Sequence, residues 1–88
     1  MKIKPGYILR EIMDIYMIMG VGSEAYSPNE ILSLNETGAF LWRILEKGAE
    51  KPELAAALQR EYDTDPQTAE RDVDVFLEML RGKALIDG

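Results

Sequence analysis

The hydrophobic pattern of the first 20 residues is typical of two short strands. Tyr7–Ile12 and residues 15–19 are rich in isoleucine, methionine and tyrosine, and only two residues separate them. Two such runs on either side of a two-residue turn predict an antiparallel hairpin. Glycine, serine, proline and asparagine gather in residues 20–29 and predict a loop, and residues 30–33 then predict a third strand.

The pattern becomes helical immediately after this third strand. Asn35 predicts an N-cap, because its side-chain oxygen can accept a hydrogen bond from a free amide of the first turn, and Glu36 places negative charge at the positive end of the helix dipole. Ser33 with Glu36 forms a competing capping box, so both starts stay open. The helix is expected to continue to about Glu46. The residues expected on its buried face are Phe40, Leu41, Ile44 and Leu45.

Two more helices are predicted after Gly48, which suits the end of the first. Pro52 suits the first position of the second helix, although Lys51 before it is a poor N-cap. Leu54 and Leu58 lie about one turn apart, so both are expected to point into the core.

The third helix is predicted to begin at Asp65-Pro66, again a cap followed by proline, and to continue to about Arg81. Gly82 then ends it, and residues 84–86 are expected to return as a short strand. The spacing of its apolar residues predicts one buried face. That face consists of Ala69, Val73, Phe76, Leu77 and Leu80.

The third helix also carries a second stripe. At 100° per residue, Thr68, Asp72, Val75 and Met79 fall together, to one side of the predicted core face. Val75 and Met79 would then be apolar but only partly buried. Two interpretations stay open: the stripe widens the contact with the core, or it forms part of a binding surface.

A hairpin, a strand and three helices, in that order, predict an α+β fold of the winged helix-turn-helix type. With 88 residues the chain fits one domain spanning residues 1–88, and its start at Met1 is the one expected of a complete polypeptide. Apolar residues make up 47% of the chain and charged residues 30%, which is typical of a folded protein rather than a disordered one.

The chain contains neither cysteine nor histidine. Disulfides, thiolate nucleophiles and the usual zinc ligand sets are therefore excluded, and any catalysis would have to rest on carboxylates, lysine or tyrosine. The apolar stretch after Lys2 and Lys4 is interrupted by Arg10, Glu11 and Asp14, so it predicts neither a secretion signal nor a membrane span. A reducing cytoplasm is the expected location, and no cofactor is expected.

Two short motifs suggest chemistry and fail on inspection. "GVGSEA" matches a dinucleotide fingerprint, but the proline-containing turn after it stops the helix that such a site needs. "DTDPQTAERDVD" has acids at three positions of a calcium loop, yet Thr68 replaces the glycine of the sharp turn and Arg71 would repel the ion. The carboxylates of the third helix are spaced four apart and are expected to face water, so no enzymatic activity is expected.

The acidic balance of the chain argues against nucleic acid as a partner. The formal net charge is −6, with 16 acidic against 10 basic residues, so the average surface repels phosphate backbones and anionic membranes. In a winged helix the third helix would enter the major groove, yet it carries four acids from residue 66 to residue 80 and only Arg71 as a cation. A nucleic-acid binder stays an alternative, as does a structural interaction domain for a folded partner.

The segment "ILSLNETGAFLWRIL", followed by "LAAALQREYDTDPQTAERDVDVFLEML" and a short "ALI" tail, resembles the PqqD family. Its members are small proteins of pyrroloquinoline-quinone and related peptide-maturation pathways, also called RiPP recognition elements. The similarity spans nearly the whole chain, although the first 20 residues are generic. Its most specific parts are residues 34–39 with Trp42, and Asp72-Val73 with Phe76, Leu77 and Leu80.

The resemblance implies a three-stranded antiparallel N-terminal sheet packed on a three-helix bundle, and no catalysis of its own. Members bind the leader segment of a ribosomally made precursor peptide and present it to a modifying enzyme, often a radical S-adenosylmethionine protein. The leader is added as an extra strand beside the third strand, in a groove also walled by the third helix. An open strand edge could also pair with a second copy, so a homodimer stays open as well.

Carried onto this sequence, the resemblance implies a peptide-binding site with two walls. The strand wall consists of Glu30, Ile31, Leu32, Ser33 and Leu34. The helix wall consists of Thr68, Arg71, Asp72, Val75 and Met79, with Arg71 and Asp72 as candidates for charged contacts at the rim. Ile31 and Ser33 share one face of the strand, Leu32 and Leu34 share the other, and the pattern leaves open which face meets the core.

Overall fold

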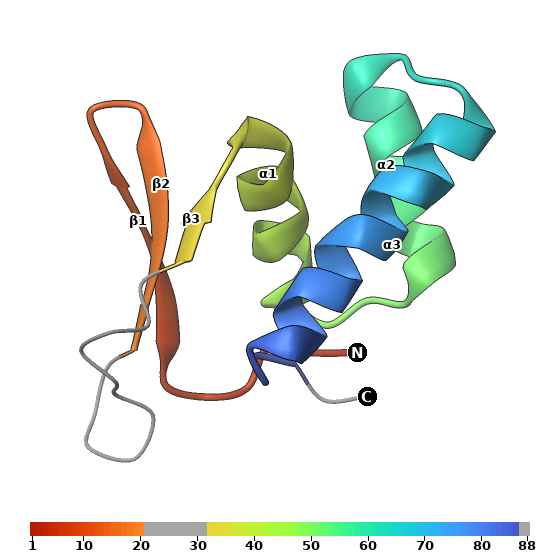
Figure 1. Ribbon diagram of the computed structural model, residues 1–88. Helices are drawn as coiled ribbons and strands as arrows, with labels where there is room; N and C mark the ends of the chain where they lie inside the picture. The colour runs from red at the N-terminus through yellow and green to blue at the C-terminus, as the bar shows by residue number, and fades with distance from the viewer. Residues whose placement is uncertain (21–31, 87–88) are drawn as a thin grey trace.

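The computed structural model describes residues 1–20 and 32–86. Within them, three antiparallel strands form one sheet, and three helices follow in the chain (Figure 1). The elements are β1 (Tyr7–Ile12), β2 (Ile15–Gly20), β3 (Leu32–Leu34), α1 (Glu36–Leu45), α2 (Lys51–Tyr62) and α3 (Pro66–Gly82). The expected α+β class, with a three-stranded antiparallel sheet before three helices, is thus confirmed.

The predicted hairpin is present, with Tyr7 opposite Gly20 at its open end and Ile12 opposite Ile15 beside the turn. Met13 and Asp14 connect the strands with φ angles of 50° and 67°. Two successive positive φ angles make a type I′ turn, whose twist matches that of the flanking strands. Methionine is uncommon in this conformation because its Cβ crowds the backbone. The Met13 side chain lies at the tip of the hairpin and is 90% exposed.

The strand order is β1-β2-β3, so among the described strands β3 lies at the edge of the sheet and pairs only with β2. Leu34 is buried and Leu32 packs against the core, whereas Ser33 between them is exposed. The face of β3 that meets the core is therefore the one with the two leucines, which answers the question that the sequence left open. Glu30 and Ile31, the start of the predicted strand, lie outside the described residues, as does most of the predicted loop.

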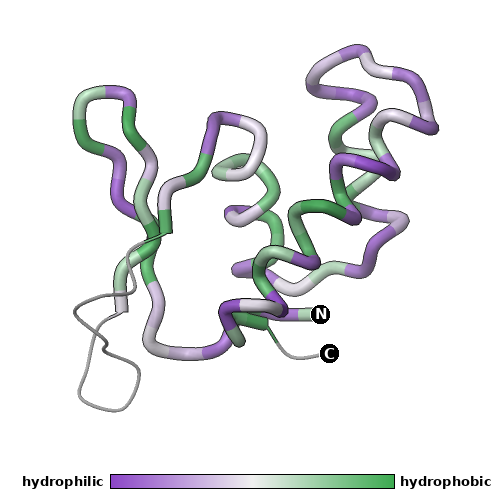
Figure 2. The backbone as a smooth tube through the Cα atoms, viewed as in Figure 1, coloured by the Kyte–Doolittle hydropathy of each residue, from purple (hydrophilic) through white to green (hydrophobic). Residues whose placement is uncertain are grey.

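The core lies between the sheet and the helices. Trp42 of α1 and Leu54 and Leu58 of α2 are almost completely buried, and the predicted face of α3 is buried throughout. Phe40 and Ile44, which were expected to be buried, are only half-buried because they border a shallow hollow on the outer side of α1. In Figure 2, hydrophobic segments recur along α1 and α3.

The start of α1 is capped by Asn35, whose Oδ1 accepts a hydrogen bond from the Gly38 N–H at 2.7 Å. This contact decides the start of the helix against the alternative capping box. The prediction that Lys51 occupies the cap of α2 is wrong, because the helix begins one residue earlier than expected. Glu50 is the N-cap there, and its backbone N–H donates to the Glu53 carboxylate at 3.0 Å.

The cap of α3 is the predicted one: Asp65 Oδ1 accepts a hydrogen bond from the Thr68 N–H at 2.7 Å. The expected terminal strand is reduced to one antiparallel bridge, between Ile3 and Ile86. This bridge holds the two ends of the described chain side by side (Figure 1). Among the described helices, none combines the length and the apolar character that a membrane crossing requires.

Candidate functional site

A groove of about 340 Å³ lies between β3, the first turns of α1 and the middle of α3. It brings together residues of the third strand and of the second stripe of α3, which are far apart in the sequence. The residues that line it are Ser33, Leu34, Asn35, Thr37, Gly38, Leu41, Asp72, Val75, Phe76 and Met79.

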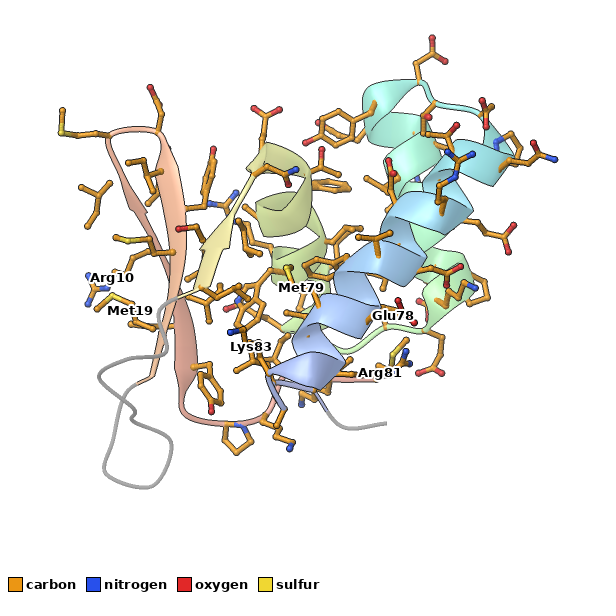
Figure 3. All side chains as sticks on the ribbon, in the orientation of Figure 1. Arg10, Met19, Glu78, Met79, Arg81 and Lys83 are labelled. Carbon is orange, nitrogen blue, oxygen red and sulfur yellow. The ribbon has the colours of Figure 1, made fainter. Side chains whose placement is uncertain are left out.

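The floor of the groove is apolar and belongs to the core. Leu34, Leu41 and Phe76 are 8%, 1% and 5% exposed, so each contributes only its outermost atoms. Met79 is half-buried and packs against the core, and it reaches from α3 toward α1 (Figure 3). Val75, in contrast, is 62% exposed at the rim. An apolar floor with an exposed valine at its border favours binding of apolar side chains.

The open edge of β3 forms one wall of the groove. In an antiparallel ladder, hydrogen-bonded and non-hydrogen-bonded pairs alternate, and the pair beside a two-residue turn is hydrogen-bonded. Counting from the turn, the residues of β2 opposite Leu32 and Leu34 are those that bond to β3. The N–H and C=O of Ser33 therefore point to the other edge, where no described strand pairs with them. They are free to bond to an added backbone.

The closed end of the groove is shaped by the abrupt junction between β3 and α1. A Cβ added to Gly38 would lie 3.2 Å from Asn35 Oδ1 and 3.4 Å from the side chain of Leu34. Glycine therefore lets the first turn of α1 pack closely on the strand. The junction "LNETG" thus combines a helix cap with a close contact, and both keep the strand edge short.

Asp72 is the only acidic or basic residue among the described residues that line the groove. No described residue forms a hydrogen bond or an ion pair with its carboxylate. Lys51 of α2 pairs with a different acid of α3, since its Nζ lies 2.6 Å from Asp74 Oδ1. This hydrogen bond to Asp74 raises the pKa of Lys51. The carboxylate of Asp72 is thus left available to a ligand.

The groove contains five of the ten residues expected to bind peptide: Ser33, Leu34, Asp72, Val75 and Met79. Leu32 packs into the core instead, and Thr68 lies in the first turn of α3 with its N–H on the Asp65 cap. Arg71 is exposed and does not line the groove, because its side chain leaves α3 on a different side. Glu30 and Ile31 cannot be placed, as they lie outside the described residues.

The sequence did not indicate the other five lining residues as part of the site. Leu41 and Phe76 were predicted to be core residues and Asn35 a cap, and each of the three also borders the groove. Periodicity indicates that a residue is buried, but it does not indicate that one side of that residue faces a hollow. The signal that was available is the compact strand-to-helix junction, which supplies Asn35, Thr37 and Gly38.

A second hollow lies on the other side of α1, bordered by Phe40, Arg43, Ile44 and Lys47 among others. Arg43 is already engaged, because its guanidinium lies 5.7 Å from the centre of the Tyr16 ring and 3.8 Å from the Glu11 carboxylate. None of the described residues that border this hollow belongs to a strand. Among the described residues there is also no cluster of acidic side chains that could hold a metal ion.

The fold and the site together define a class of small α+β modules in which an edge strand lies open beside a helix wall. Within that class, the chain belongs to the PqqD family: the family model "Coenzyme PQQ synthesis protein D (PqqD)" matches residues 16–86. The resemblance found in the sequence is thereby confirmed.

Two solved structures are similar to this chain over almost its whole length. A complex of TbiB1 with the TbiA(beta) leader peptide is 30% identical, with a TM-score of 0.80, and the match covers 100% of this chain and 96% of that one. Lasso peptide synthetase B1 complexed with the leader peptide has a TM-score of 0.76 over 96% and 93% of the two chains. At 20% identity, this second likeness shows the fold alone. No match was found among curated proteins.

Proposed function

We propose that this protein binds the leader segment of a ribosomally made precursor peptide as an extra strand beside β3. The observation that carries the proposal is the groove itself, in which the open edge of β3 faces the stripe of Asp72, Val75 and Met79. The likeness to TbiB1, which was solved with a leader peptide, supports the same function. In this role the protein has no chemistry of its own and acts as an adaptor.

Because the open edge of β3 is short, backbone hydrogen bonds and side-chain contacts would contribute unequally to leader affinity. A backbone hydrogen bond contributes only about 0.5–1.5 kcal/mol net, and an extended peptide loses conformational entropy when it is ordered. Within the described strand, Ser33 offers one donor and one acceptor. Most of the affinity and the selectivity would therefore come from apolar leader side chains that enter the groove over Leu41 and Phe76.

The bound leader would be presented to a peptide-modifying enzyme in the cytoplasm, where ribosomal precursors are made. The family resemblance favours a radical S-adenosylmethionine enzyme as that partner. One structural neighbour is instead named as part of a lasso peptide synthetase. The adaptor role is the same in both cases, because the groove contacts the leader and not the modified segment.

An NMR titration with synthetic leader peptides of candidate precursors tests the proposal. We expect the largest amide shifts at Ser33 and along residues 72–79, together with slowed hydrogen exchange of the Ser33 amide. A scrambled leader of the same composition is the control. Shifts confined to the free edge of β1, or to the hollow beside Phe40, would contradict the proposal.

A further inference from the structure

The face of the sheet that points away from the helices is unexpectedly apolar. Directly opposed residues of an antiparallel pair share a face, so the register places three cross-strand pairs on this side. The pairs are Ile8 with Met19, Arg10 with Met17, and Ile12 with Ile15. Together with Ser33 opposite Met17, they form what we call the outward sheet face. Figure 3 shows Arg10 and Met19 projecting together on this side.

Burial confirms that these side chains do not belong to the core. The half-buried residues Ile8, Met17 and Met19 do not pack against the core cluster, although Tyr7, Leu9 and Tyr16 on the other face of the same strands do. Ile12 and Ile15 are 51% and 54% exposed. An antiparallel sheet with one face on the core usually has a polar outer face, and this one has five apolar positions out of six in the hairpin.

The charge of the outward sheet face is also unlike that of the rest of the molecule. The chain has 16 acidic residues, yet the cross-strand pairs of this face contain none of those that the structure describes, and the single charge of these pairs is Arg10. No described residue forms an ion pair or a hydrogen bond with the Arg10 guanidinium. Methionine side chains around such a position can adapt to a partner of irregular shape.

A second copy of this chain would fit the face poorly. Two copies stacked about a twofold axis would bring their central Arg10 side chains together, and burying two like charges without counter-ions is costly. A partner with an apolar patch around a carboxylate would instead satisfy both the apolar pairs and the guanidinium. The net charge of −6 also disfavours an anionic membrane as the occupant.

We propose that the outward sheet face docks the peptide-modifying enzyme, through an apolar patch of that enzyme centred on an Asp or Glu. The inference rests on the proposed function, because it takes the partner to be the enzyme that receives the leader. A leader strand added beside β3 would extend the same sheet, and its residues facing the same way as Ser33 would continue this face. The enzyme would then contact adaptor and leader side by side.

The test uses the purified chain, a fluorescently labelled leader peptide that it binds, and the enzyme that modifies the corresponding precursor. Arg10→Glu reverses the central charge, and the double variant Ile12→Thr with Ile15→Thr removes apolar surface while it keeps the β-branching that strands favour. Arg60→Glu, at the exposed end of α2, is the matched charge control. Thermal unfolding of each variant, followed by the fluorescence of the buried Trp42, verifies the fold.

We expect Arg10→Glu to weaken binding of the enzyme by about tenfold or more, because it places like charges in an apolar contact, while leader affinity stays within about twofold of wild type. The Ile12→Thr and Ile15→Thr double variant should likewise weaken binding of the enzyme while leader affinity stays nearly unchanged. Arg60→Glu should leave both affinities unchanged. The inference is overturned if the enzyme binds both face variants as it binds wild type. It is also overturned if sedimentation shows that wild type dimerises and Arg10→Glu does not. Failure of the wild-type chain to bind its leader would contradict the proposed function instead.

Discussion

Val75 and Met79 lie one turn apart on the same stripe of α3, but they differ in burial. Substitutions at the two positions can therefore distinguish an effect on leader binding from an effect on stability. Val75 is 62% exposed, whereas Met79 packs against the core. Val75→Asp should therefore weaken leader binding by about tenfold or more, since it places a charge beside an apolar contact, with little change in unfolding temperature. Fluorescence anisotropy of a labelled leader and thermal unfolding measure the two effects.

Met79→Asp is the informative comparison, because a buried charge there should lower the stability as well as the affinity. If Val75→Asp destabilised the protein as strongly as Met79→Asp, the stripe would be a part of the core and the groove would lose its helix wall. The sequence could predict that the two residues share a stripe from their spacing. Their difference in burial depends on how α3 lies against α1, which is a long-range property.

Asp72 predicts a charge preference in the leader. It is the only acidic or basic residue among the described residues that line the groove and has no partner among them, so a Lys or Arg of the leader would pair with it. Asp72→Asn should weaken binding of such a leader by about tenfold and reduce the dependence of affinity on salt. Glu78→Gln, an acid of the same helix that does not line the groove, is the control (Figure 3). Equal losses in both variants would show a general effect of net charge.

At the scale of the elements, local signals predicted most of the fold. The two-residue hairpin turn and the Asp65-Pro66 start lie where the pattern predicted them, and the Asn35 cap is one of the two starts that it left open, because each depends on neighbouring residues alone. The start of α2 was missed because Glu50 is a weak cap by itself. It caps the helix here with the help of Glu53, and it also pairs with the amino group of Met1 from the far end of the chain.

The cap of α3 predicts a specific dependence of stability on pH. The hydrogen bond from the Thr68 N–H lowers the pKa of Asp65 below its usual value. A lowered pKa in the folded state adds stability above the usual carboxylate range, and this stability is lost as the pH falls through the folded-state value. Asp65→Asn keeps an N-cap but not the charge, so its unfolding temperature should be lower than that of wild type at neutral pH, and the difference should shrink as the pH falls below the usual carboxylate range. A difference that persisted unchanged at low pH would contradict this role of the carboxylate.

At the scale of the whole molecule, leader binding should raise the stability of the fold by linkage. At a free leader concentration of 100 times Kd, the free energy of unfolding should increase by about 2.7 kcal/mol. For a domain of this size that corresponds to a rise of about 10 °C or more in Tm. Trp42, the only tryptophan and fully buried, reports the transition. A scrambled leader should produce no rise, and an unchanged Tm with the true leader would argue against a site in the folded state.

The arrangement of the elements is where sequence reasoning reached its limit. The apolar residues of the hairpin suggested strands, but not that five of them would lie on a face away from the helices, because that depends on the register of β1 and β2. Likewise, the groove exists only once α3 lies opposite β3. The family resemblance predicted that α3 lies opposite β3, whereas the spacing of Val75 and Met79 alone did not predict it.

The bridge between Ile3 and Ile86 has a practical consequence for protein engineering. It is supported by a hydrogen bond from the Lys4 N–H to the Leu85 carbonyl at 2.9 Å, so the polypeptide enters and leaves this unit at one spot. A domain with adjacent ends can be inserted into a surface loop of an unrelated host protein through short linkers at both ends, without distorting either fold. If the groove binds a leader as proposed, a host grafted in this way would capture any substrate that carries the leader sequence.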